Sequence, residues 1–226
     1  MERNTRKRLW TGLGLLLAFA LWTVLILLID VQTAGPCGTR VGFAALNLCF
    51  HRLTGVHMRL YTVTDWLGLV PIAVCLGFGV LGLVQLLRRR SLRRVDPELL
   101  LLGAYYVLVI LAYLFFEAVP INYRPILIEG RLEASYPSST TLLVLSVMPT
   151  LSLQIDRRSK SAAVRGIVRA FAGLFSAFMV LGRLISGVHW ITDIVGAVFL
   201  SLGLFLLYCY CVEALDRRGE KQHGIQ

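Results

Sequence analysis

The sequence has little charge for its size. Asp, Glu, Lys and Arg make up 16% of the 226 residues, whereas hydrophobic residues make up 57%. The mean hydropathy is +0.71. A composition this apolar excludes an ordinary soluble domain and places the chain among integral membrane proteins.

Other signals are also absent. The sequence has no CxxC, no Cys/His metal-ligand spacing, no internal repeat and no low-complexity tract. We therefore expect one membrane domain over residues 1–226, with neither a metal site nor another cofactor. Cys37 and Cys49 could pair if their side of the membrane is oxidising, although spacing alone does not establish a bridge. The apolar runs lack charges at mid-membrane, which disfavours a transporter.

Six apolar runs are long enough to cross a bilayer, for which about 20 residues are needed. They are residues 9–29, 66–87, 99–116, 135–155, 163–182 and 194–212. We predict an all-α, polytopic membrane protein, a bundle of six transmembrane helices. The connection 31–61 shows apolar residues at helical spacing and could form a short helix on the membrane surface. A polar tail follows at 213–226.

The connections between these runs alternate in charge. Most of the 23 basic residues lie in one set, namely Arg3, Arg6, Lys7, Arg8, Arg88, Arg89, Arg90, Arg93, Arg94, Arg157, Arg158, Lys160, Arg165, Arg169, Arg217, Arg218 and Lys221. The positive-inside rule puts that set and both termini in the cytoplasm. Contact with anionic membrane lipids explains the basic charge, so no nucleic-acid partner is needed.

Three polar clusters fall on the other, outer side. They are "NYRP" at 122–125, "YPSSTT" at 136–141 and "GRLISGVHWITD" at 182–193. Helical hairpins would bring the three together at the outer interface. Each cluster also has a plain structural explanation: a proline turn, a helix start that is at the same time an anion site, and an interfacial histidine.

The third cluster carries the most chemistry. His189 and Asp193 are four residues apart and would share one face of a helix. A carboxylate on one imidazole nitrogen fixes the tautomer and makes the other nitrogen a better nucleophile or base. Arg183 could fork onto phosphate oxygens.

Together the clusters resemble the three motifs of the type-2 phosphatidic acid phosphatase superfamily, integral membrane lipid phosphatases that share a site with vanadium haloperoxidases. Those motifs are Lys–x6–Arg–Pro, Pro–Ser–Gly–His and Ser–Arg–x5–His–x3–Asp. Arg124, Arg183, Gly187, His189 and Asp193 match. The resemblance implies a superfamily core over about residues 62–212 and, with the compactness of the chain, a bacterial plasma membrane. The charge count above makes the site outward-facing at the bilayer surface.

The resemblance also implies roles. His189 would attack phosphorus and become a phosphohistidine, and Asp193 would orient it. Arg124 and Arg183 would neutralise the equatorial oxygens. The phosphate-binding cradle would be completed by Ser138, Ser139 and Thr140. The substrate would be a lipid phosphate or diphosphate, and no metal would be required.

Four positions depart from the motifs. Glu117 stands for the first-motif lysine, Ser139 and Thr140 stand for Gly–His of the second motif, and Gly182 stands for the third-motif serine. The missing histidine is the family's general acid, and such an acid is typically worth about 10²–10⁴-fold in rate.

Three interpretations remain open. An isoprenoid-lipid diphosphate on the outer leaflet would need little acid help, because its leaving group is a phosphate. A relocated acid could replace the histidine, with Glu117, Glu129 and Glu133 as candidates and His51 and His57 as remoter ones. A catalytically impaired relative could instead bind a phospholipid headgroup or a protein partner.

Overall fold

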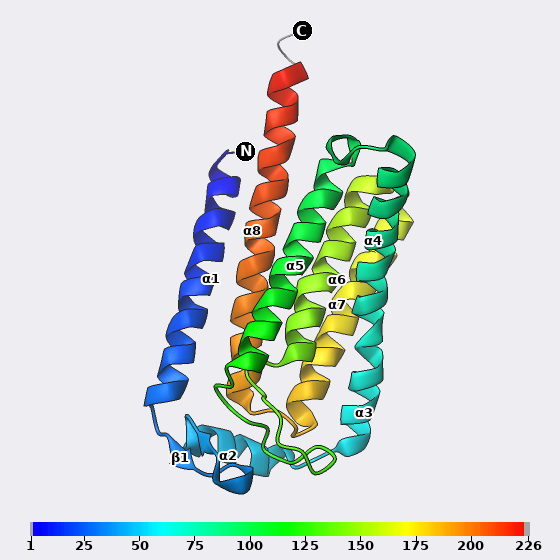
Figure 1. The fold of residues 1–226 in the computed structure, drawn as a ribbon. Coiled ribbons are helices and arrows are strands. Elements are labelled where there is room, and N and C mark those ends of the chain that lie inside the picture. The colour runs from blue at the N-terminus through cyan, green and yellow to red at the C-terminus, as the bar shows by residue number, and fades with distance from the viewer. Residues whose placement is uncertain (1, 224–226) are drawn as a thin grey trace.

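A computed structural model describes residues 2–223, with side chains described from residue 3 to residue 217. The described residues form a bundle of six long helices (Figure 1). These are α1 (Glu2–Leu28), α4 (Leu69–Arg89), α5 (Pro97–Ala118), α6 (Ser139–Arg158), α7 (Ala162–Ile185) and α8 (Ile191–His223). The predicted all-α membrane fold is thus confirmed. Residues 213–223 of the predicted tail continue α8, and residues 224–226 lie outside the described part.

Five helical segments of the described chain are long and apolar enough to cross a membrane. They are Arg3–Leu28, Met58–Arg89, Pro97–Ala118, Ala162–Ile185 and Ile191–Arg217. The sequence predicted six spans. Among the long helices, α6 is the one that is not apolar enough to be counted as a membrane span. It packs against α4, α5, α7 and α8. Because protein rather than lipid surrounds α6, its side chains need not be uniformly apolar.

The polar residues of α6 are paired inside the bundle. The Thr150 hydroxyl is 2.7 Å from that of Tyr106 on α5, and Gln154 Nε2 donates to the Tyr208 hydroxyl on α8 at 2.8 Å. Both α6 residues are fully buried. A buried polar group is tolerated when it is hydrogen-bonded, so these pairs let a semi-polar helix occupy the centre of the bundle.

Helix α1 lies along α8 at the edge of the bundle. Glycines allow the two backbones to approach closely. A Cβ built on Gly12 would lie 3.2 Å from the Gly203 carbonyl oxygen, and one on Gly203 would lie 2.8 Å from Leu16. Small residues at such crossings are typical of helix packing in membranes.

The lower end of the bundle in Figure 1 carries short elements and the long connection 119–138. The short elements are β1 (Gln32–Thr33), a 3-10 turn (Pro36–Gly38), β2 (Arg40–Val41), α2 (Ala44–Thr54) and α3 (Met58–Leu67). β1 and β2 pair antiparallel. Helix α2 is the short helix expected within 31–61. Cys37 and Cys49 are both free and exposed, so they form no bridge.

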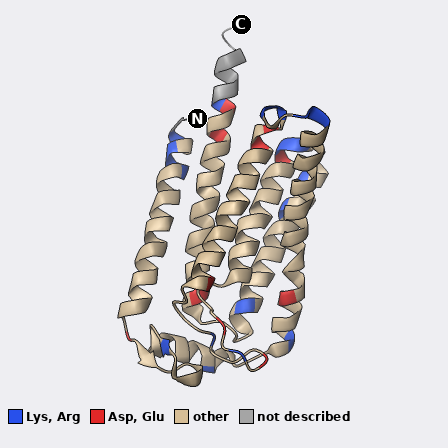
Figure 2. Ribbon diagram, in the orientation of Figure 1, with Lys and Arg blue, Asp and Glu red and all other residues tan. Residues whose placement is uncertain are grey.

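The opposite end carries most of the basic residues (Figure 2). Here α4 connects to α5 through a 3-10 turn (Leu92–Arg94). The Asp96 side chain accepts a hydrogen bond from Glu98 N and caps α5. Arg157 at the end of α6 donates to both Glu98 and Asp216. The two ends therefore differ in charge and in structure.

Candidate active site

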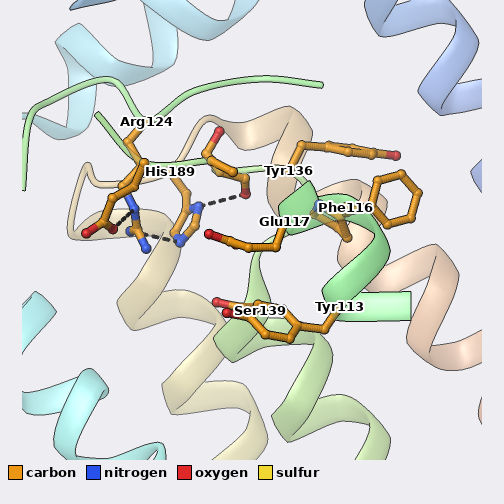
Figure 3. A pocket seen from close by; sticks show the side chains of 11 residues that line it. Tyr113, Phe116, Glu117, Arg124, Tyr136, Ser139 and His189 are labelled. Atoms are coloured by element: carbon orange, nitrogen blue, oxygen red, sulfur yellow. Dashed lines mark hydrogen bonds and ion pairs between the residues drawn. The ribbon is translucent and has the colours of Figure 1, made fainter. Parts of the chain in front are cut away.

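The three polar clusters lie at one end of the bundle and line one pocket (Figure 3). The first follows α5, the second opens α6, and the third joins α7 to α8. The pocket measures about 230 Å³. Its walls are Tyr113, Phe116, Glu117, Arg124, Glu133, Ala134, Ser135, Tyr136, Pro137, Ser139 and His189.

His189 is fixed through both ring nitrogens. Its Nε2 lies 3.3 Å from Arg124 Nη1, and its Nδ1 lies 3.2 Å from the Ser135 carbonyl oxygen. A guanidinium can only donate and a carbonyl can only accept, so Nδ1 carries the proton and Nε2 holds a lone pair. That lone pair faces the arginine in the pocket. The ring is therefore held in the tautomer that a nucleophile or base requires.

Burial keeps this imidazole neutral. His189 is 3% exposed. Desolvation is the main cause that lowers its pKa to about 4, and the charges of Arg124 and Arg183 act in the same direction while nearby Asp193 opposes them. At neutral pH the Nε2 lone pair is consequently free of a proton.

The Asp193 carboxylate is hydrogen-bonded to neighbouring loops and lies near the His189 ring. Its Oδ2 accepts from Trp190 N at 3.0 Å, and its Oδ1 accepts from Asn122 Nδ2 at 3.2 Å. The distance from Oδ2 to His189 Nδ1 is 3.7 Å, which is longer than a hydrogen bond. Asp193 is fully buried. It lies where it would stabilise a positive charge on His189.

Arg124 is positioned by its own loop. Its backbone N donates to the Glu133 carbonyl at 3.0 Å, and its Nε lies 2.9 Å from the Glu133 carboxylate. Bridges Tyr123–Ala134 and Ile128–Arg131 close the loop into a hairpin. The guanidinium is thus already paired with one carboxylate before any ligand arrives.

Arg183 is the more deeply buried arginine, at 2% exposure. Its Nη2 donates to Asp65 Oδ1 and to Thr140 Oγ1, each at 2.7 Å. Its Nε and Nη1 have no hydrogen-bond partner within the described part of the chain. The guanidinium of Arg183 lies 4.8 Å from the centre of the Tyr61 ring, and that of Arg124 lies 5.9 Å from it. Buried donors without a partner are costly, and an anion would satisfy them.

The start of α6 differs from the sequence prediction. The helix begins at Ser139, not near residue 135, because the residue before Pro137 is disfavoured in a helix. Ser138 N donates to the Asp193 carbonyl, and Ser138 Oγ donates to Thr141 Oγ1. Ser138 is thus occupied structurally, while Ser139 lines the pocket. The N–H groups of the first helical turn precede any intrahelical acceptor and remain available to an anion.

The three candidate acids occupy different places. Glu117, at the end of α5, lines the pocket, and among the described residues it has no hydrogen bond or ion pair. Glu133 also lines the pocket but is paired with Arg124. Glu129 lies in the turn of the hairpin, with φ of 50°, and does not line the pocket.

The two loop histidines are tied to backbone carbonyls. His51 Nε2 lies 3.1 Å from the Gly187 oxygen, and its ring lies 5.6 Å from that of Trp190. His57 Nε2 lies 2.9 Å from the Thr54 oxygen. The His51 contact packs α2 against the loop between α7 and α8, whereas the His57 contact is local to the connection between α2 and α3.

At two positions of the third cluster, steric crowding explains why the residue is glycine. Gly187 has φ of +69°, and a Cβ there would lie 2.0 Å from the Gly55 carbonyl oxygen. A Cβ on Gly182 would lie 2.7 Å from Thr64 Cγ2 on α3. The space that the family's serine would use is therefore partly filled by Thr64.

Sequence reasoning missed the contribution of α3 and of the pocket walls. Asp65 and Tyr61 come from α3, Tyr113 from α5, and Asn122 and Ser135 from the long connection. Asp65 had a signal, because it is a lone acid at the edge of an apolar run. Within the described residues, no group of three or more His, Cys, Asp and Glu side chains is arranged to hold a metal ion.

Comparison with known proteins agrees with the motifs. Residues 73–217 match the family described as the PAP2 superfamily. A similar solved structure is described as the first transmembrane PAP2-type phosphatidylglycerolphosphate phosphatase from Bacillus subtilis; it is 17% identical, with a TM-score of 0.61 over 92% of this chain and 97% of that chain. No curated protein matches the sequence. The expected resemblance is confirmed, and the chain belongs to the PAP2 superfamily.

Proposed function

We propose that the protein hydrolyses a lipid-linked phosphate or diphosphate through a phosphohistidine on His189. The observation that carries this proposal is the state of the imidazole: its proton is on Nδ1, and the Nε2 lone pair lies 3.3 Å from Arg124 inside a pocket. A mere structural histidine would not need a guanidinium at its free nitrogen. Membership of a superfamily of membrane phosphatases supports the same reaction class.

The proposed reaction has two steps. In the first, His189 Nε2 attacks phosphorus and the bond from phosphorus to the leaving oxygen breaks, while Arg124 and Arg183 bind the equatorial oxygens. The imidazolium that forms lies 3.7 Å from the Asp193 carboxylate, which stabilises its charge. In the second step, water attacks phosphorus, the phosphorus–nitrogen bond breaks, and neutral His189 returns.

The proton for the leaving oxygen needs a source, because Thr140 stands where the family has histidine. Of the candidate acids, Glu117 and Glu133 line the pocket, and the Glu133 carboxylate is already paired with Arg124. A diphosphate substrate, for example an isoprenoid diphosphate, would lower this demand because phosphate is a better leaving group than an alkoxide.

A second, apolar pocket supports a lipid substrate. It measures about 350 Å³ and shares Tyr113 and Ser139 with the polar pocket. Its other walls include Leu69, Ile72 and Val109, from the membrane-spanning part of α4 and α5. A phosphate beside Ser139 would have room for its hydrocarbon chain on the lipid side.

The direction in which the site faces follows from charge. The end opposite the pocket carries most of the Lys and Arg residues (Figure 2), so we propose that this end is cytoplasmic and that the pocket faces outward. Cys37 and Cys49 are exposed at the pocket end. A membrane-impermeant maleimide should label them in intact cells, and labelling only after lysis would reverse the orientation.

One observation favours a second function, binding without turnover. Both phosphate-facing arginines are already paired with carboxylates, Arg124 with Glu133 and Arg183 with Asp65. Such pairing weakens the field that stabilises a transition state. A catalytically impaired relative that holds a phospholipid headgroup would tolerate it.

The test is phosphate release by purified protein from lipid monophosphates and diphosphates, with His189→Ala measured beside it. We expect release that the variant loses by at least about 10³-fold, the scale for removal of a covalent nucleophile. Rapid quenching with labelled substrate should also trap an acid-labile, base-stable label. No release above His189→Ala on any lipid, together with retained lipid binding, would establish the binding function instead.

A further inference from the structure

The candidate site contains more carboxylate than guanidinium side chains. Its formal charges at pH 7 come from two guanidiniums and four carboxylates, namely Arg124, Arg183, Asp65, Glu117, Glu133 and Asp193. His189 adds no charge at this pH, because burial lowers its pKa to about 4. A site that must receive a phosphate is therefore net negative before the phosphate arrives, which opposes binding.

Three of the four carboxylates have partners. Glu133 lies 2.9 Å from Arg124, Asp65 lies 2.7 Å from Arg183, and Asp193 accepts two hydrogen bonds. Glu117 alone has no hydrogen bond or ion pair within the described part of the chain. Figure 3 shows its side chain extending into the pocket toward His189. Glu117 is exposed, so solvent rather than a protein group balances its negative charge before a ligand binds.

Aromatic rings stand beside this carboxylate. Tyr113 lies one helical turn before Glu117 on α5, and Phe116 and Tyr136 line the same pocket with ring centres 5.7 Å apart. A carboxylate next to aromatic faces is a favourable environment for an ammonium group. At about 230 Å³ the pocket is smaller than the roughly 300–1,000 Å³ typical of sites that enclose a whole drug-sized ligand, so it suits a headgroup.

We propose that the substrate carries an ammonium group close to its reacting phosphate, and that Glu117 binds this ammonium. The proposal rests on the proposed function and names its substrate class: a lipid phosphate with an amine within a few bonds of the phosphate. The phosphate lies between Arg124, Arg183 and His189. The ammonium lies against Glu117 and Tyr113, and its charge offsets the carboxylate that would otherwise repel the phosphate.

The inversion of charge at residue 117 explains the direction of the preference. A lysine, which the first motif has at this position, would attract the phosphate and repel an amine on the same molecule. Glu117 does the opposite. The described residues also offer no metal site that would neutralise the carboxylates in another way.

The test compares two lipids that differ in one group: a long-chain 2-aminoalkyl phosphate and the 2-hydroxyalkyl phosphate of equal chain length. Phosphate release is measured with EDTA present, so that no divalent cation supplies the missing charge. The variants are Glu117→Gln and Glu117→Lys. Glu129→Gln is the matched control, because it removes the same charge from the same connection outside the pocket.

We expect the wild-type protein and the Glu129→Gln control to favour the amino lipid in kcat/KM by about tenfold or more, the size of one charge-assisted contact. Glu117→Gln should remove the preference, and Glu117→Lys should reverse it. Equal rates for the two lipids in the wild-type protein, or a preference that Glu117→Gln leaves unchanged, would overturn the proposal while leaving the phosphatase function standing.

If the protein hydrolyses neither lipid, the proposed function is decided by the wider panel of lipid monophosphates and diphosphates, and the ammonium site is tested separately. The same pair is then compared by equilibrium binding. Tenfold tighter binding of the amino lipid that Glu117→Gln abolishes supports an ammonium site, and equal binding overturns it.

Discussion

His189 should give the protein a stability that falls with acidity in a defined window. The unfolded chain holds an ordinary imidazole with a pKa near 6.5, whereas the folded pKa is about 4. Between these values the unfolded state binds a proton that the folded state does not. The histidine's contribution is therefore fully present above about pH 6.5 and is lost as pH falls toward 4.

The size of the effect follows from the two pKa values. At pH 5 the unfolded imidazole is almost fully protonated and the folded one is mostly neutral, which costs about 2 kcal/mol relative to pH 7. Below pH 4 the loss levels off at about 3 kcal/mol. For a chain of this length, 2 kcal/mol corresponds to roughly 4–8 °C in Tm.

The assay is thermal unfolding in a mild detergent at pH 7, 6 and 5, for the wild type and for His189→Gln. Other groups also titrate in this range, so the quantity of interest is the difference between the two proteins. We expect the advantage of the wild type to shrink by about 2 kcal/mol from pH 7 to pH 5. A difference that stays constant over this range would mean that His189 is not buried as a neutral ring.

Two further predictions concern the neighbours of this histidine. Gly187→Ala should destabilise the protein by about 2 kcal/mol or more and abolish activity, because a φ of +69° is strained for alanine and the new Cβ would meet the Gly55 oxygen. The measurement is thermal unfolding, and the control is Gly166→Ala, whose Cβ would lie in open space on α7. Equal effects of the two substitutions would refute this reasoning. Asp65→Asn should tighten binding of inorganic phosphate by about three- to tenfold, because it removes a carboxylate, 60% exposed, that competes for Arg183; unchanged or weaker binding in calorimetry would show that Asp65 supports the site instead.

The helices could be predicted because the apolar runs are long and the charged connections are short. The start of α6 could not be placed from apolarity alone, since residues 135–138 are buried and uncharged although they precede the helix at Ser139. Pro137 indicates a later helix start, because the residue before a proline avoids helical geometry. The long helix that is not apolar enough to be counted as a span is also the one that protein surrounds.

The candidate site could be predicted only as far as its motifs reach. Arg124 lies beside His189 in the polar pocket, whereas Arg183 does not line that pocket and shares with Arg124 a position near the Tyr61 ring. Asp65 could not be assigned to Arg183 from sequence, because 118 residues separate them and no periodicity relates α3 to α7. Long-range pairs of this kind are set by tertiary packing.

The departures from the family motifs are connected in space, and this argues against simple decay of an unused site. Thr140 replaces the histidine, yet its hydroxyl accepts from the same Arg183 nitrogen that binds Asp65. Gly182 replaces the serine where Thr64, on the helix that carries Asp65, leaves no room for a Cβ. Random loss would leave buried donors and gaps at such positions, each at a cost in free energy. Instead, the Thr140 hydroxyl is hydrogen-bonded to Arg183 and the space beside Gly182 is filled by Thr64 of α3, which is what a site adapted to a different substrate requires.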